Sequence, residues 1–487
     1  MKFIPYITFF LLLFMAGEVL YINFAKKREK LIKLITENLL RKASHQVGEI
    51  YFFSPAIRHL VTHFMLSFDK KAKEALFLMC HGKETDEMKN YINECSDKYL
   101  SATYNAFSNM EFAEEIFSEI AINNKIRVQR AYIAMLKGKK DEMDELLYEV
   151  DEKKLPIPEK ALYRYCMAKK ALEIGDLYNA ANDAGVAVKL FHKTKSFYEE
   201  AQTYILLGEI YRVSAATDMA YFMYTEAKKI AEKQHNEPLK ADILGNLGML
   251  FTMQERYDAA AEVFTEALEI NKKNIRDKAC ACIYNQMSLM SLLNTKYDMA
   301  KLYANQALRY SASDTDAFSF ELMAKVDFAM GKYEDAIKNA DVAKKKYWKY
   351  GNLSAYFDAL YLEASSLFNL QKYDEAEEKL RHLISIEQEN KTVFHVANAY
   401  SLLGSIFMKK GEYKRAKPFF EESIRHELKN NRPEGMVSDY VNIGIILKNQ
   451  DDKEGALMNF NEAKRYAAEV QNEELSALVD KYIEDLK

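Results

Sequence analysis

Apolar and polar positions along this chain follow a pattern that returns about every 40 residues. Each copy begins with a polar turn that leads into Tyr, then an acidic or polar residue, and then an alanine. These closing alanines are Ala180, Ala220, Ala260, Ala300, Ala336, Ala376, Ala416 and Ala456. Their separation is 40 residues, apart from 36 between Ala300 and Ala336. A regular period of this length indicates stacked copies of one supersecondary unit.

A second small residue lies 12 positions before each closing alanine. The set is Ala168, Gly208, Gly248, Ser288, Ala324, Ala364, Gly404 and Gly444. Large apolar residues follow four positions after several of the alanines, and small residues follow seven positions after, so both lie on the same stripe of a helix. Two helices approach closely where their side chains are small. The pattern therefore predicts a helical hairpin in each copy, with both small residues buried where its helices cross.

This spacing of small, aromatic and alanine positions resembles the tetratricopeptide repeat, whose usual period is about 34 residues. The resemblance is strong from 161 to 470, and two further copies fit less well upstream, at 101–120 and 131–150. It implies an all-α fold, a right-handed tetratricopeptide superhelix (an α-solenoid) of about 8–10 hairpins. We expect this solenoid over 96–470, with a capping helix over 471–487.

The first 25 residues predict a membrane anchor. Phe3 to Phe24 is apolar apart from Thr8, Glu18 and Asn23. As a helix it measures about 33 Å, enough for a hydrocarbon core of about 30 Å. A cleaved signal peptide and a buried helix remain alternatives, although no convincing cleavage site follows. Positive charge after the span favours repeats on the cytoplasmic side, with export as the alternative.

Residues 26–95 form a basic segment between this span and the solenoid. From 26 to 73 it holds eleven Lys or Arg against four acidic residues, which gives a net charge of +7. Such a segment beside an anchor favours contact with anionic lipid head groups. A solvated helix face explains the same charges equally well.

Composition narrows the classes of function. The chain of 487 residues has a net charge of −4, which argues against a nucleic-acid partner. Its five cysteines are odd in number and scattered, which favours a reducing compartment. His59 and His63 are one helical turn apart, but no second pair of ligands has matching spacing, so we expect no metal site. We find no catalytic motif and predict a protein without enzymatic activity or cofactor.

The resemblance implies that the first helix of each repeat lines a concave groove. With the closing alanine counted as position 20, the inward positions are 2, 5, 6, 9, 12 and 13. Their polar residues include Asp242, Asn246, Asn285, Glu321, Lys325, Asp358, Tyr361, Asn398, Asn442 and Lys448. Asparagine both donates and accepts hydrogen bonds, so it matches an extended peptide backbone. We therefore name Asn246, Asn285, Tyr361, Asn398 and Asn442 as candidate groove residues, although asparagine is also simply tolerated on exposed faces.

Some family members bind acidic tails with paired Lys and Asn across three repeats. Here Ile205 and Glu209, and later Ser401 and Ser405, stand where those residues are needed, so this clamp is absent. The sequence favours an adaptor held at a membrane through residues 3–24, with a protein or peptide as its partner. The alternative is a peptide-responsive regulator whose output module is the basic segment 26–95.

Overall fold

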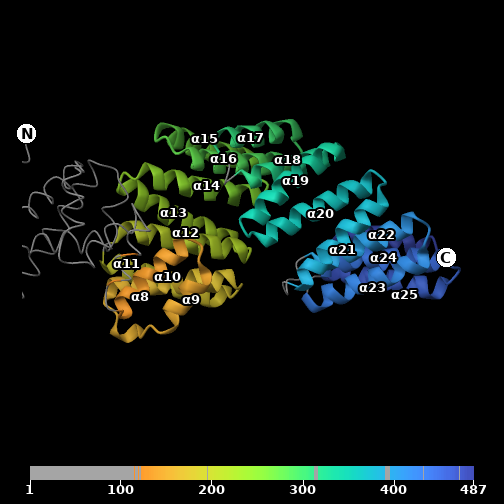
Figure 1. The fold of residues 1–487 in the computed structure, drawn as a ribbon, viewed down its shortest axis with the longest axis horizontal. Coiled ribbons are helices and arrows are strands. Elements are labelled where there is room, and N and C mark those ends of the chain that lie inside the picture. The colour runs from red at the N-terminus through yellow and green to blue at the C-terminus, as the bar shows by residue number, and fades with distance from the viewer. Residues whose placement is uncertain are drawn as a thin grey trace, which may run out of the picture. The chain divides into compact units, whose positions relative to one another are not determined.

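The computed structural model describes residues 122–487, apart from 195, 312–315, 390–394, 431–432, 471 and 487, and also 115 and 119. Throughout this part of the chain the regular elements are helices (Figure 1). They fall into two compact units, of which one ends at Asn274 and the other begins at Ile275. The predicted all-α fold of stacked hairpins is confirmed. The segments 3–24 and 26–95 lie outside the described residues, as does 101–120 apart from 115 and 119.

Within the described residues, the unit that ends at Asn274 contains a short hairpin followed by three longer ones. Its helices are α8 (Asn124–Leu136), α9 (Lys140–Tyr148), η3 (Glu152–Lys154, a 3₁₀ turn), α10 (Ile157–Glu173), α11 (Leu177–Thr194), α12 (Phe197–Val213), α13 (Thr217–Lys233), α14 (Glu237–Met253) and α15 (Tyr257–Lys273). Helices α10, α12 and α14 each pack against the next helix of the chain, and α10 also contacts α12, as α12 does α14.

The unit that begins at Ile275 repeats this arrangement. Its helices are α16 (Asp277–Leu293), α17 (Tyr297–Tyr310), α18 (Ala317–Ala329), α19 (Tyr333–Lys349), α20 (Leu353–Asn369), α21 (Tyr373–Glu389), α22 (Val396–Lys409), α23 (Tyr413–Asn430), α24 (Pro433–Asn449), α25 (Lys453–Glu469) and α26 (Glu473–Glu484). The even-numbered helices from α16 to α24 are the first helices of their hairpins, and each contacts the next first helix along the unit.

The eight closing alanines lie where the sequence places them. Each has an exposed fraction of 0%, so their predicted burial is confirmed. In four of the repeats the small residue 12 positions earlier is a glycine that meets the side chain 16 positions after itself. At Gly208, Gly248, Gly404 and Gly444, that side chain is an aromatic ring, and a Cβ added to the glycine would lie 2.3–2.8 Å from it. At the Ala and Ser positions the residue 16 later is Ala184, Ala304, Ala340 or Leu380. The two positions are thus matched in size.

A residue in the left-handed region ends the first helix of every hairpin from α10 to α25. These residues are Gly175, Ala215, Glu255, Thr295, Gly331, Gln371, Gly411 and Asp451, with φ between 56° and 78°. At Thr295 the backbone N–H donates to the carbonyl of Leu292 at 3.0 Å, and that of Lys296 donates to Ser291 at 2.8 Å. These bonds satisfy carbonyl groups that a helix end leaves free.

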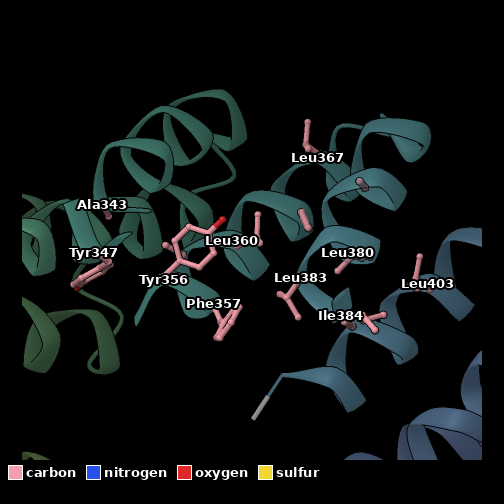
Figure 2. Packing of buried hydrophobic residues seen from close by; sticks show 14 of the residues in the cluster. Ala343, Tyr347, Tyr356, Phe357, Leu360, Leu367, Leu380, Leu383, Ile384 and Leu403 are labelled. Atoms are coloured by element: carbon pink, nitrogen blue, oxygen red, sulfur yellow. The ribbon is translucent and has the colours of Figure 1, made fainter. Parts of the chain in front are cut away.

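Side chains from five successive helices, α18 to α22, form one core of the second unit. Phe357 and Leu360 on α20, Leu380 and Leu383 on α21 and Leu403 on α22 are at most 1% exposed. Figure 2 shows these apolar side chains among the helices. This packing holds the first helices α20 and α22 beside the second helix between them.

Helix α26 covers the end of the second unit. Val479 is fully buried there, whereas Leu478 is 44% exposed. Leu475, Tyr482 and Ile483 also pack against the terminal core. Within the described ranges, no helix combines the length and apolar character needed to cross a membrane.

Candidate functional site

One exposed residue recurs at the same place on the first helices of the second unit. At position 2 of successive repeats stand Cys282, Phe318, Asp358, Asn398 and Ser438. Phe318 is 40% exposed and the Asp358 side chain 47%. We call this row, with positions 5, 6 and 9 of the same helices, the first-helix face. Its residues belong to α16, α18, α20, α22 and α24, the helices labelled so in Figure 1.

Three candidate groove residues lie on this face with different exposure. Asn398 on α22 is exposed, and Asn442 on α24 is half-buried. Tyr361 on α20 is half-buried and packs against the core of its unit, and burial raises the pKa of its hydroxyl. Helices α22 and α24 are in contact, so the two asparagines stand on neighbouring helices.

The side chains of the other two candidates form hydrogen bonds within the protein. Asn285 on α16 is only 6% exposed, and its Oδ1 accepts a hydrogen bond from Ser319 Oγ on α18 at 2.9 Å. Asn246 belongs to the first unit, where it is half-buried on α14. Its Nδ2 donates to the carbonyl of Asp242 at 2.9 Å.

The bond at Asn285 recurs three repeats later and shows what position 5 does in these repeats. Ser401, also at position 5, donates to Asp439 Oδ1 on the next first helix at 2.5 Å. Both bonds join position 5 to position 3 of the following repeat. In these two repeats position 5 therefore links adjacent first helices, which explains why Asn285 is buried. Burial raises the pKa of Asp439 to about 6, although the Ser401 hydroxyl opposes this shift.

A histidine that sequence reasoning did not single out lies beside this face. His395 caps α22 at its N-terminus, and its ring lies between two carboxylates. Nδ1 is 3.0 Å from Glu387 Oε1 on α21, and Nε2 is 2.9 Å from Asp358 Oδ1 on α20. A neutral imidazole has one N–H, so only the protonated ring donates at both nitrogens. The two carboxylates raise the pKa of His395 to about 9 against the opposing effect of burial.

The same histidine also closes the connection between α21 and α22. Its backbone N–H donates to Glu387 Oε1 and Oε2 at 3.1 and 3.2 Å, and the Glu387 side chain is fully buried. The bond from His395 lowers the pKa of Asp358. The following repeat has Glu427 in the place of Glu387 but Gly435 in the place of His395. Comparison of these copies is the signal that could have identified the contact from sequence.

A second charged group lies on α18. Glu321, which is 4% exposed, accepts from Lys325 Nζ at 2.5 Å and from the Tyr347 hydroxyl at 2.6 Å. Burial first, and then the charge of Glu321, raise the pKa of Tyr347 well above its usual value. Lys325 in turn lowers the pKa of Asp358, so the two groups act on each other across neighbouring helices.

The face offers hydrogen bonds and charge for recognition. In the part of the chain that the structure describes, no three His, Cys, Asp or Glu side chains are grouped so that they could hold a metal ion. Its chemistry is that of amides, hydroxyls, apolar side chains and one exposed carboxylate.

Comparisons with known proteins agree with the geometry of the hairpins. Tetratricopeptide-repeat models match residues 199–273, and residues 357–390 and 397–426. The quorum sensor NprR from B. thuringiensis, in its apo form, is similar over 70% of this chain and 97% of its own, with 15% identity and a TM-score of 0.51. The apo form of RapI is similar over 72% and 98%, with 12% identity and a TM-score of 0.50.

A signal-transduction ATPase with a tetratricopeptide sensor, from Pyrococcus horikoshii, covers more of the chain but superposes less well. It matches 88% of this chain and 75% of its own, with 14% identity and a TM-score of 0.48. No curated protein matches the sequence. At these identities the likeness concerns the fold.

Proposed function

Because this chain is a tetratricopeptide-repeat protein, we propose that it is a scaffold that binds a protein or peptide segment along the first-helix face of residues 275–487. The observation that carries the proposal is the row of exposed side chains at position 2. Core positions of the same helices are buried, whereas this position stays open in five successive repeats. An elongated row on stacked helices matches an elongated ligand.

Asn398 and Asn442 supply the hydrogen bonds in this proposal. An extended segment presents N–H and C=O groups, and a carboxamide can donate to one and accept from the other. The two residues stand on helices that contact each other, so one segment can reach both. Asn285 is assigned to the joint between repeats, because its oxygen already accepts from Ser319.

The test compares binding with folding. Proximity labelling of the native protein identifies a partner, and the purified partner is then titrated against an Asn398→Ala/Asn442→Ala variant. We expect a loss of about 1–3 kcal/mol in binding for the pair, from about 0.5–1.5 kcal/mol per hydrogen bond. The matched control is Asn305→Ala, an exposed asparagine on the second helix α17. Unchanged affinity in a folded double variant would exclude this face.

We also propose that residues 3–24 anchor the scaffold in a membrane, with the repeats on the cytoplasmic side. The length of the apolar run and the basic residues after it support this. The protein should stay with membranes after a high-salt wash and leave them only in detergent. Recovery of the full-length chain in the soluble fraction would remove the anchor from the proposal.

A regulator is the second candidate, with the basic segment 26–95 as its output module. One support is the fold that this chain shares with the quorum sensor NprR. The other is the net charge of +7 that this chain carries over 26–73. Deletion of 26–95 distinguishes the two. An adaptor keeps its partner after this deletion, whereas a regulator keeps its ligand but loses its cellular output.

A further inference from the structure

The charged groups linked to Asp358, directly or through His395 and Lys325, do not sum to zero. Glu321, Asp358 and Glu387 are negative, and Lys325 and His395 are positive, which gives 2 − 3 = −1 for this group. We propose that the segment bound to this face carries one basic side chain, a Lys or Arg, which pairs with Asp358. This inference rests on the proposed function and names the chemistry of its ligand.

Asp358 is the member of the group that can meet a ligand. Glu321 and Glu387 are buried, at 4% and 0% exposed, and each already accepts two or more hydrogen bonds inside the protein. The Asp358 side chain is 47% exposed, and one of its oxygens receives the bond from His395. The unbalanced charge is therefore presented to solvent at Asp358.

The neighbouring position favours a long cationic side chain. Phe318, at position 2 of the preceding repeat, is 40% exposed, and its helix α18 contacts α20, which carries Asp358. A Lys or Arg stem can cover an aromatic surface while its head reaches a carboxylate. The other members of the row are uncharged, namely Cys282, Asn398 and Ser438. The ligand residues that contact them therefore need no charge.

Two lysines on the same helices lie too far from position 2 to offset the charge of Asp358. Lys409 and Lys448 occupy positions 13 and 12 and lie in the last turns of α22 and α24. Lys448 Nζ is 3.4 Å from the carbonyl of Asp485. They lie at the opposite end of their helices from position 2, so they do not neutralise Asp358.

The probe is a random dodecapeptide library displayed on phage and selected on the full-length chain in detergent. Binders that also bind the Asn398→Ala/Asn442→Ala variant equally well are discarded. We expect the remaining peptides to share one Lys or Arg in an otherwise uncharged sequence. A selected peptide is then synthesised with and without that residue, as Lys and as Met, and titrated against the variants below.

Asp358→Asn removes the charge but keeps an oxygen that can accept from His395, so the fold should persist. We expect the Lys peptide to bind this variant about three- to tenfold more weakly, and the Met peptide to bind both proteins equally. The advantage of the Lys peptide should also shrink at high salt. Asp374→Asn, at a 95% exposed aspartate on the second helix α21, should change nothing.

The outcomes separate the two proposals. The proposed basic residue is wrong if the peptides that depend on the two asparagines show no excess of Lys or Arg. It is also wrong if they bind Asp358→Asn as well as they bind wild type. In both cases the face remains the binding site. A library that yields no peptide dependent on the two asparagines overturns the face, and the basic residue with it.

Discussion

Replacement of Gly248 by alanine tests the size matching at a helix crossing. Gly248 lies on α14 against the ring of Phe264 on α15, which is fully buried. A Cβ built at Gly248 would lie 2.3 Å from Cε1 and 2.6 Å from Cδ1 and Cζ of that ring. Carbon atoms in contact prefer about 3.5–4.0 Å, so the ring or the helix must move by more than about 1 Å.

Two opposing effects set the magnitude. Alanine in a helix interior is favoured over glycine by about 1 kcal/mol. Overpacking of a buried site costs about 1–3 kcal/mol and sometimes more, and we expect the clash to exceed the gain here. Gly248→Ala should therefore lower the free energy of unfolding by about 1–2 kcal/mol. Gly185→Ala is the matched control, because this residue is inside α11 with no atom within 4 Å of its added Cβ, and it should gain about 1 kcal/mol.

The chain itself supplies the compensating change. Ala364 and Leu380 occupy the same two positions in a later repeat, and both are fully buried. Phe264→Leu should therefore cost less in the Gly248→Ala background than in wild type, with a coupling of about 0.5–3 kcal/mol. Urea unfolding of the four proteins, followed by circular dichroism, measures it. If Gly248→Ala is as stabilising as Gly185→Ala, or if the two changes simply add, the size matching is refuted.

Three further changes test the turns and the polar joints. Thr295→Gly should stabilise the protein by about 1 kcal/mol, because a β-branched residue is held there at φ 56°, and an unchanged urea midpoint would contradict this. Asn285→Ala should cost about 1–3 kcal/mol, since it leaves the buried Ser319 hydroxyl without its acceptor, whereas Asn398→Ala should change stability by less than about 0.5 kcal/mol. The folded pKa of Asp439, about 6, is above its ordinary value of 3.8, so stability should fall as pH rises from about 4 through 6; denaturation at several pH values should show this slope in wild type and not in Asp439→Asn.

Much of the repeat architecture could be predicted from the sequence because its constraints are local. A closing alanine and a small residue 12 positions earlier fix where two helices cross, and all eight alanines are buried as expected. The glycine-to-aromatic matching was not predicted, although both members are visible in the sequence. It appears only when the residue 16 positions later is compared across repeats, as Gly208 with Tyr224 against Ala168 with Ala184.

The candidate site was harder to predict because position in a repeat does not determine exposure. Asn285 and Asn398 both occupy inward positions of first helices, yet Asn285 is bonded to the next repeat and Asn398 is exposed. The difference is that Asn285, at position 5, faces the neighbouring first helix. The periodicity of one helix does not show which of its residues face the next repeat. His395 was missed for a related reason, since its partners lie 8 and 37 residues away on two other helices.

The ring of His395 yields a prediction about alkaline pH. Its folded pKa of about 9 is above the ordinary 6.5, so the stability that its protonation provides is complete below about pH 6.5 and is lost as pH rises through 9. The shift corresponds to at most about 3 kcal/mol. The groups that face it are Asp358 and Glu387, with Lys325 acting on Asp358. Wild type should therefore lose stability between pH 6.5 and 9.5 relative to a Glu387→Gln/His395→Gln variant, which leaves no buried carboxylate without its cation. A constant difference across that range, measured by urea unfolding, would mean that the ring is neutral and that only one of its nitrogens donates.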